Sequence, residues 1–264
     1  MNSPPQEVLT RILRKGMTPL LVFDFDGTLS PIVENPEEAQ ISPEALSLLK
    51  RLSSIDRVIT GIMSGRSLED VKKRVPLPLP VWGGNHGAEV EVLGETRILI
   101  DTSRLEALKE FGKVLSSLPL DERVLVEDKK FSISVHTRRV SPEEEKEVQA
   151  LLRERVKAFP GLAWRRGKRV FEVFPSGAPG KGKALFTVKK ILEEKRKETY
   201  YPFYFGDDVT DKNVYEEMKK RGCGHFTFVE GGREVSPEGD HIVNGIDGLQ
   251  EVMEKIVAAL KGSA

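Results

Sequence analysis

The sequence predicts an α/β protein in which a core built on a parallel sheet is interrupted by an inserted α+β domain. Near both ends of the chain, short apolar runs alternate with helical patterns, which is typical of parallel strands joined by crossover helices. Between about residues 103 and 174 this alternation gives way to paired strands, which indicates a separate antiparallel layer.

The first core segments predict strand, helix, strand and helix in that order. Residues 19–24, PLLVFD, form a continuous apolar run that ends in acids and a Gly-Thr turn, so we expect a central strand buried on both faces. Ser42 precedes a proline and leucines at helical spacing, which predicts the start of a helix. A second strand is expected over 58–63, and Ser67 with Asp70 three residues later is typical of a cap for the next helix.

The remaining segments complete the inserted domain and return to the core. In the insertion we expect a helix from about 103, strands over 123–127 and 131–137, a helix opened by 141–143, and strands over 162–166 and 169–174, with turns at 128–130 and 167–168. After the glycine-rich segment PSGAPGKG we expect a helix over 183–195, a strand over 201–205, a helix after Thr210, a strand over 226–229 and a terminal helix. The core is therefore predicted to comprise 1–103 and 179–264, and the inserted domain 104–178.

Composition excludes several classes of function. Lys and Arg number 41, as do Asp and Glu, so neither a nucleic acid nor an anionic membrane surface is expected as a partner of the 264-residue chain. Cys223 is the single cysteine, which rules out an internal disulfide framework or a multi-cysteine zinc site and favours a reducing compartment. Apolar runs of signal-peptide or membrane-spanning length are missing from the sequence. We therefore expect a cytoplasmic protein that acts on a small molecule.

Two acidic clusters follow predicted strands. Asp24 and Asp26 end the first strand, and Asp207, Asp208 and Asp211 in GDDVTD follow the strand over 201–205. Because carboxyl ends of parallel strands share one edge, these five carboxylates would gather and repel one another unless a hard divalent cation such as Mg²⁺ lay among them. The simpler alternatives are a strand followed by a turn at the first cluster and a helix cap, from Asp208 or Thr210, at the second.

Groups suited to a phosphate lie near the same edge. Ser64 and Gly65 follow the strand over 58–63 at the start of a helix, where backbone N–H groups and the helix dipole favour anions. Lys181, in the glycine-rich segment that opens another helix, would neutralise phosphoryl oxygens and the Asp24 carboxylate. The alternatives are an ordinary helix cap at Ser64 and a solvated lysine at 181.

The sequence contains four motifs in a fixed order, namely DFDGT, SGR, a lysine ahead of a helix and GDDVTD. The haloacid dehalogenase superfamily of phosphatases has such motifs in the same order, so the chain resembles that superfamily. The resemblance implies a Rossmann-like core with an inserted cap. It also implies that Asp24 attacks phosphorus to give an aspartyl-phosphate, while Asp26 protonates the leaving alcohol and then activates water.

The same resemblance implies the remaining roles at the core. Mg²⁺ would be held by the Asp24 side chain, the Asp26 backbone carbonyl and Asp207, with Asp208 and Asp211 in support. Ser64 and Lys181 would bind the transferring phosphoryl group, and we place Gly65 and Arg66 beside them in substrate binding.

The middle of the chain is more specifically similar to trehalose-6-phosphate phosphatases. The similarity rests on GNHGAE at 84–89, VEDKKFSISVHTR at 126–138 and FEVFPSGAPGKGKAL at 171–185. By that resemblance the insertion is a cap that binds the disaccharide and closes over the core. Its sugar-binding residues would be Glu127, Lys129, Arg138 and Glu172, joined by Asn85 and His86 from the core.

The resemblance implies hydrolysis of trehalose 6-phosphate and a functional pairing with a trehalose-6-phosphate synthase. Lys212 stands where the family has an acid, Thr137 where it often has tyrosine, and the PGKG loop is one residue longer. The alternatives are a phosphatase for mannosyl- or glucosyl-3-phosphoglycerate, glucosylglycerol phosphate or a sugar monophosphate, a phosphomutase, and a catalytically silent sugar-phosphate sensor or synthase subunit.

Overall fold

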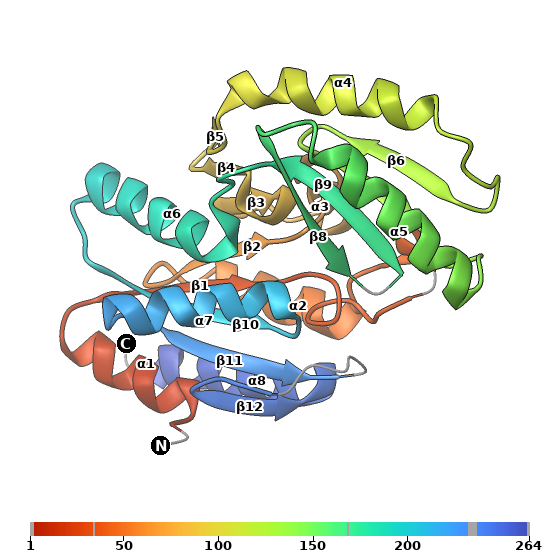
Figure 1. The fold of residues 1–264 in the computed structure, drawn as a ribbon. Coiled ribbons are helices and arrows are strands. Elements are labelled where there is room, and N and C mark those ends of the chain that lie inside the picture. The colour runs from red at the N-terminus through yellow and green to blue at the C-terminus, as the bar shows by residue number, and fades with distance from the viewer. Residues whose placement is uncertain (1–2, 34, 168, 232–236, 263–264) are drawn as a thin grey trace. The chain divides into compact units, whose positions relative to one another are not determined.

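The computed structural model describes residues 3–33, 35–167, 169–231 and 237–262 (Figure 1). The chain divides into two compact units. Unit 1 comprises residues 1–97 and 179–264, and unit 2 comprises residues 98–178. Within the described residues, no helix is both long and apolar enough to cross a bilayer.

Unit 1 is built on an eight-stranded sheet with the strand order β12-β11-β10-β1-β2-β3-β4-β5. The strands are β1 Thr18–Phe23, β2 Ile59–Met63, β3 Val81–Gly84, β4 Glu89–Val92, β5 Glu95–Ile98, β10 Tyr200–Gly206, β11 His225–Glu230 and β12 His241–Asn244. Neighbours from β12 through β3 run parallel, and β4 runs antiparallel to β3. Strand β1 therefore lies centrally between β10 and β2, as predicted, and its carboxyl end shares an edge with theirs.

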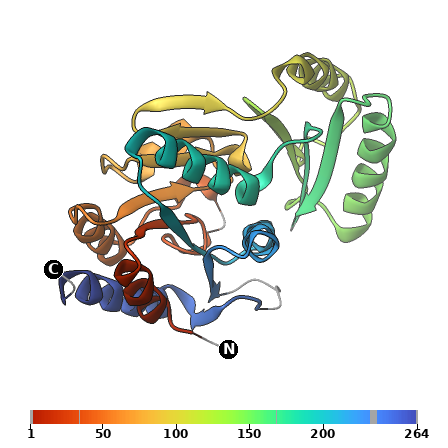
Figure 2. The same cartoon turned by 90° about the vertical axis from the view of Figure 1, so that its left-hand side faces the viewer.

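Helices cover both faces of this sheet (Figure 2). On one face lie α1 Pro5–Arg14, α2 Pro43–Ser53, α3 Leu68–Arg74 and α8 Gly245–Gly262, and on the other α6 Gly180–Arg196 and α7 Val209–Arg221. Leu21 and Phe23 of β1 pack in the core formed with the first group of helices. The alternate residues Leu20 and Val22 are equally buried, because a central strand presents a side chain to each face in turn.

Unit 2 is a four-stranded antiparallel sheet, ordered β6-β7-β9-β8, with two helices on one face (Figure 2). Its elements are α4 Leu105–Ser116, β6 Leu125–Lys129, β7 Ser132–His136, α5 Pro142–Val156, β8 Leu162–Gly167 and β9 Val170–Pro175. A short 3-10 helix at Thr102–Arg104 precedes α4, and unit 1 has two more at Pro36–Glu38 and Asn85–Gly87. The second predicted turn, at 167–168, is described only in part: Gly167 ends β8, and Lys168 lies outside the described residues.

The predicted fold class is confirmed, since a mostly parallel sheet core is interrupted by an antiparallel sheet with its own helices. The predicted insertion, 104–178, falls within unit 2. Helix α1 and strands β3, β4, β5 and β12 were not predicted, and β5 is exposed along its whole length.

Candidate active site

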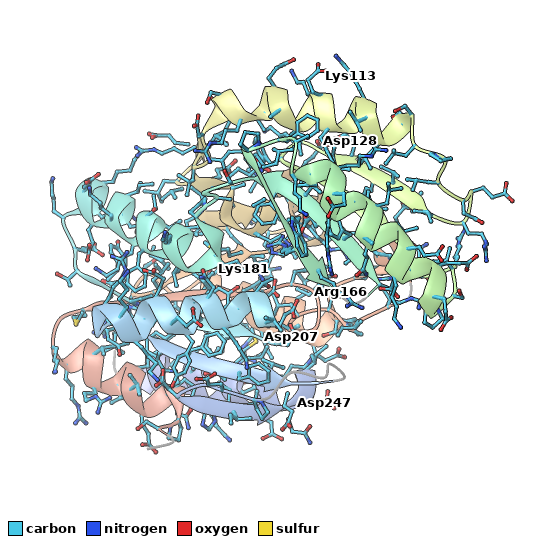
Figure 3. The ribbon with its side chains drawn as sticks, in the orientation of Figure 1. Lys113, Asp128, Arg166, Lys181, Asp207 and Asp247 are labelled. Atoms are coloured by element: carbon cyan, nitrogen blue, oxygen red, sulfur yellow. The ribbon has the colours of Figure 1, made fainter. Side chains whose placement is uncertain are left out.

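Three parallel strands of unit 1 deliver polar residues to one edge of the sheet. Asp24 follows β1 and donates its backbone N–H to the Phe205 carbonyl at 2.8 Å, which fixes it beside the end of β10. Ser64 follows β2 and donates its N–H to the Gly83 carbonyl of β3 at 3.0 Å. Asp207 follows β10, and Lys181 lies in the first turn of α6; both are labelled in Figure 3. The edge predicted from strand endings is therefore present.

Three aspartates form a buried cluster at this edge. Carboxylate oxygens of Asp24, Asp207 and Asp211 all lie within 4.8 Å of one another. The Thr28 hydroxyl donates to Asp207 Oδ1 at 3.0 Å, so the Gly-Thr turn after β1 folds back onto β10. The close approach requires Gly27, because a Cβ there would lie 2.5 Å from Asp207 Cγ.

A fully buried lysine joins two of these acids. Lys181 Nζ lies 2.9 Å from Asp24 Oδ2 and 2.7 Å from Asp211 Oδ1. Burial alone would lower the pKa of Lys181, but the negative charges of Asp211 and Asp24 outweigh it and raise the pKa above its usual value. Lys181 is therefore held as a cation beside the Asp24 carboxylate.

Asp211 supports the cluster with both of its oxygens. Its Oδ1 accepts from Lys181 and from the Tyr204 hydroxyl at 2.8 Å, and its Oδ2 accepts the N–H groups of Asp207 at 3.2 Å and Asp208 at 3.0 Å. Burial opposes ionisation of Asp211, but Lys181 and these donors hold its pKa below the usual value. The Asp208 carboxylate accepts the Val209 N–H at 2.6 Å and caps α7.

The charge and chemistry of this cluster fit a divalent metal ion. With all three carboxylates ionised, they and the Lys181 ammonium would carry a net formal charge of −2, which a divalent cation would neutralise. Burial, with the negative charges of Asp211 and Asp207, raises the pKa of Asp24 well above its usual value, and Lys181 only partly offsets this. Oxygen ligands of this kind suit hard cations such as Mg²⁺. Asp24 and Asp207 are the side chains best placed to hold the ion, because each Asp211 oxygen already accepts two hydrogen bonds. Each Asp24 oxygen has one described partner, the Phe25 N–H or Lys181.

Arg66 holds the second aspartate of DFDGT. Its Nε and Nη2 donate to the two oxygens of Asp26 at 2.7 and 2.6 Å, and its Nη1 donates to Asp70 at 2.9 Å. The guanidinium also lies over the Phe25 ring, 5.4 Å from its centroid, and the side chain is 11% exposed. Burial would lower the pKa of Arg66, but hydrogen bonds to Asp26 and Asp70 raise it. Arg66 was predicted to bind substrate. In its described contacts the guanidinium binds the carboxylates of Asp26 and Asp70 instead, and so orients Asp26.

The SGR and GNHG loops interlock. Asn85 donates its N–H to the Arg66 carbonyl at 2.7 Å, and His86 donates its N–H to the Ser64 carbonyl at 3.0 Å. Asn85 and His86 have φ values of 49° and 54°, a left-handed conformation that is uncommon for residues other than glycine, and these two hydrogen bonds help to hold it. A Cβ at Gly65 would lie 2.5 Å from His86 Cε1, so the glycine lets the imidazole pack against the loop. The structure therefore brings together these predicted site residues.

Several residues that position the site were not predicted. Asn213 Oδ1 accepts the Gly182 N–H at 3.1 Å, which ties the first turn of α6, and so Lys181, to α7. Glu89 Oε1 accepts from Asn85 Nδ2 at 2.8 Å and from the Leu68 N–H at 3.1 Å. Thr28 and Tyr204 complete the set around Asp207 and Asp211. Glu89 is the last residue of the GNHGAE motif, and this was the signal in the sequence that could have identified it.

The four sugar-binding residues predicted in the insertion all belong to unit 2. Glu127, Lys129 and Glu172 lie on the face of the sheet opposite α4 and α5. Glu127 Oε2 lies 3.1 Å from His136 Nε2 and 3.3 Å from Lys129 Nζ. The hydrogen bond with His136, followed by the charge of Lys129, lowers the pKa of Glu127 against the effect of partial burial. Arg138 lies two residues beyond the end of β7.

Comparison with known proteins identifies relatives over most of the chain. A family model described as Trehalose-phosphatase matches residues 22–238. Trehalose-phosphate phosphatase B of Arabidopsis thaliana is 32% identical over 229 residues, which cover 81% of this chain and 60% of that protein. Trehalose-phosphate phosphatase of Mycobacterium tuberculosis is 34% identical over 210 residues, covering 77% of this chain and 52% of that protein. The chain thus spans about half to three fifths of the length of these relatives.

Solved structures share the fold at lower sequence identity. The C-terminal domain of Candida albicans trehalose-6-phosphate phosphatase superimposes with a TM-score of 0.72 at 21% identity, covering 97% of this chain and 96% of that one. A phosphatase of the haloalkanoate (HAD) superfamily from Bacteroides thetaiotaomicron gives 0.62 at 16%, covering 92% and 96%. The C-terminal domain of a C. albicans trehalose synthase regulatory protein gives 0.66 at 14%, covering 94% and 97%. With its fold of the HAD type and a family match over most of its length, the chain belongs to the trehalose-phosphatase family.

Proposed function

We propose that this protein is a magnesium-dependent phosphatase that hydrolyses trehalose 6-phosphate to trehalose and phosphate. The observation that carries the proposal is the buried Asp24 carboxylate, held by Lys181 and surrounded by Asp207 and Asp211 at the end of the central strand. A nucleophile needs this kind of fixed orientation, and the family match supports the choice of substrate.

The proposed reaction has two steps. A carboxylate oxygen of Asp24 bonds to phosphorus as the bond from phosphorus to the sugar oxygen breaks, and Asp26 gives its proton to that oxygen. Asp26 then takes a proton from a water molecule whose oxygen attacks phosphorus, and the bond from Asp24 to phosphorus breaks. Arg66 directs the Asp26 carboxyl group through its paired hydrogen bonds.

Other core residues support the phosphoryl group in this proposal. The Lys181 ammonium and the Ser64 hydroxyl bind phosphoryl oxygens, and Gly65 provides a loop without a side chain beside them. Asp24, Asp207 and the Asp26 backbone carbonyl would hold Mg²⁺, which supplies positive charge to the phosphoryl oxygens, with Asp208 and Asp211 in support.

In this proposal, residues 104–178 bind the trehalose moiety of the substrate. We propose that Glu127, Lys129, Arg138 and Glu172 bind its hydroxyls, with Asn85 and His86 contributing from unit 1. Sugar hydroxyls are donors and acceptors at once, so carboxylates alternating with cations satisfy both functions. We further propose a cytoplasmic location and a functional pairing with a trehalose-6-phosphate synthase that supplies the substrate.

A sugar-phosphate sensor is the rival from another class. It gains support from the fold shared with the C-terminal domain of the C. albicans regulatory protein. However, a binding module needs neither a nucleophile nor an acid–base, whereas this chain has Asp24 in the buried cluster and Asp26 oriented by Arg66. A phosphomutase shares the aspartyl-phosphate and differs in product, a sugar phosphate isomer instead of free phosphate.

The deciding experiment measures phosphate release from trehalose 6-phosphate, with and without Mg²⁺, beside glucose 6-phosphate and mannosyl-3-phosphoglycerate. The Asp24→Asn variant is the blank. Magnesium-dependent release that is strongest with trehalose 6-phosphate and missing in the variant supports the proposal. If only another ester were turned over, the proposed substrate would be wrong but the proposed chemistry would still hold. Full activity of Asp24→Asn would show that the proposed mechanism is wrong.

A further inference from the structure

Four polar residues, one from each strand, lie in register across the sheet of unit 2. Glu127 of β6 pairs with Ser134 of β7, Ser134 pairs with Glu172 of β9, and Glu172 pairs with Arg165 of β8. Directly opposed residues of neighbouring antiparallel strands point to the same face of a sheet. The four side chains therefore form one row on one face, which we call the polar row.

The polar row lies opposite the helices of unit 2. The alternate residues Ile133 and Val135 of β7, with Phe171 and Val173 of β9, form the core with α4 and α5. Because side chains alternate between faces along a strand, the polar row points away from that core. The face is thus not needed to pack the helices.

Glu172 is held from both neighbouring strands. On the β7 side, the Ser132 hydroxyl donates to Glu172 Oε1 at 2.8 Å. On the β8 side, Arg165 Nε donates to Glu172 Oε2 at 2.6 Å, and Arg165 Nη2 pairs with the same oxygen. The glutamate is only 8% exposed, so its orientation depends on these partners.

Arg165 is itself fixed in place. Its guanidinium lies over the Phe174 ring, 5.0 Å from the centroid, and the side chain is 33% exposed. The aromatic ring and the carboxylate together set the plane of the guanidinium.

We propose that Arg165 is a positioning residue for substrate selection, which fixes the Glu172 carboxylate so that it accepts hydrogen bonds from sugar hydroxyls. This inference rests on the proposed function and adds to it a residue that does not itself bind the substrate. An acceptor that is oriented before the sugar arrives loses little conformational freedom on binding, so its contribution to affinity is larger.

The test compares two adjacent arginines. Arg165→Met keeps an unbranched stem against Phe174 and removes the donors to Glu172. The matched control is Arg166→Met, because Arg166, labelled in Figure 3, is the next residue on β8, belongs to the other face and lies 3.7 Å from Glu145. Each variant is assayed with trehalose 6-phosphate and with p-nitrophenyl phosphate, an ester without sugar hydroxyls.

We expect Arg165→Met to raise KM for trehalose 6-phosphate about tenfold or more, because a Glu172 carboxylate that is no longer held in place would lose its hydrogen bond to the sugar. Hydrogen bonds to charged groups are typically worth a factor of this size. Its kcat/KM for p-nitrophenyl phosphate should stay within about twofold of the wild type, and Arg166→Met should leave both substrates within the same margin. Arg165→Lys keeps the charge and should recover part of the loss. In a Glu172→Gln background, Arg165→Met should add little, since the arginine acts through the glutamate.

Equal effects of Arg165→Met on both substrates, or equal effects of the two arginine variants, would overturn the proposal and leave a structural role. If Arg165→Met does not fold, the Arg165→Lys variant carries the same comparison, and an unchanged KM for trehalose 6-phosphate there overturns the proposal. A wild-type protein that turns over p-nitrophenyl phosphate but not trehalose 6-phosphate would overturn the proposed function. The role of Arg165 as stated would then also be wrong, and the wild-type assay alone distinguishes this case.

Discussion

Lys181 and Asp211 are joined by an ion pair of 2.7 Å in which neither side chain is appreciably exposed. The same ammonium reaches Asp24 at 2.9 Å, so one cation neutralises part of the charge of two buried acids. Removing one member of a buried pair leaves the other charge without compensation, which is more harmful than never having the pair.

We therefore expect Lys181→Met to abolish turnover and to destabilise the fold by about 3–5 kcal/mol. The control is Lys183→Met, which changes an exposed lysine in the same turn of α6 and should have little effect on either property. Thermal unfolding and phosphate release measure the two effects. A Lys181→Met protein as stable as the wild type would contradict the assigned charge balance.

Asn213 gives a second prediction, because it fixes the first turn of α6 that carries Lys181. Asn213→Ala removes the acceptor for the Gly182 N–H and should cost about 1 kcal/mol, as the loss of other helix caps does. Misplacement of Lys181 should lower kcat as well. Asn213→Asp retains an acceptor oxygen and should restore most of both properties. If the aspartate variant were as impaired as the alanine variant, the hydrogen bond to Gly182 would not be the reason for either loss.

The contrast between Lys181 and Asn213 explains what the sequence predicted and what it did not. Asp24, Ser64 and Asp207 could be placed together because each directly follows a strand, and parallel strand ends converge on one edge whatever the details of packing. Asn213 acts on a residue 31 positions away through the packing of α6 against α7. No local pattern reports such a contact, and the same holds for the Arg66 pair with Asp26, 40 positions apart.

Secondary structure was missed for similar reasons. Strand β5 is exposed and charged, so it has none of the apolar alternation by which strands are predicted. Helix α1 buries Val8, Leu9 and Ile12 at helical spacing, but prolines and charges at the N-terminus obscured that signal. In unit 2 the strands that became β7 and β9 were predicted as members of strand pairs bounded by turns. Their side chains do alternate, because one face packs against helices and the other does not.

Arg66 was predicted to bind substrate, and its contacts with Asp26 lead to a different kinetic expectation. Arg66→Lys keeps the charge but loses the paired hydrogen bonds of the guanidinium. If Arg66 acts by orienting Asp26, kcat should fall about tenfold or more while KM changes little, which is the signature of an interaction needed in the transition state. A rise in KM with kcat unchanged would instead show that Arg66 binds substrate. Steady-state kinetics with trehalose 6-phosphate separates the two results.

Gly27 and Gly94 form a matched pair for testing the turn after β1. Their φ values are +88° and +83°, so alanine is strained at both positions by about 1 kcal/mol or more. A Cβ at Gly94 meets nothing within 4 Å, whereas at Gly27 it would lie 2.5 Å from Asp207 Cγ. We expect Gly94→Ala to lower Tm modestly with activity intact. Gly27→Ala should lower Tm further and raise the Mg²⁺ concentration needed for half-maximal activity. Equal losses in the two variants would mean that Asp207 accommodates the methyl group.

Asp70 gives the stability of unit 1 a dependence on pH. Partial burial raises the pKa of Asp70, but hydrogen bonds from Arg74 and Arg66 outweigh this and hold it below the usual value. A carboxyl group whose pKa is lower in the folded state stabilises the fold above its unfolded pKa, near 3.9, and loses that contribution as pH falls through the folded value. Asp70→Asn should therefore lower Tm by about 2–4 °C at pH 7, as expected for up to about 1 kcal/mol in a partly exposed pair. The difference from the wild type should persist to pH 5 and shrink progressively below pH 4. The control is Glu69→Gln, at an exposed neighbouring position paired with Lys73, which should lower Tm by less at every pH. If the Tm difference between Asp70→Asn and the wild type instead widened in acid, the two arginines would not be stabilising the Asp70 carboxylate.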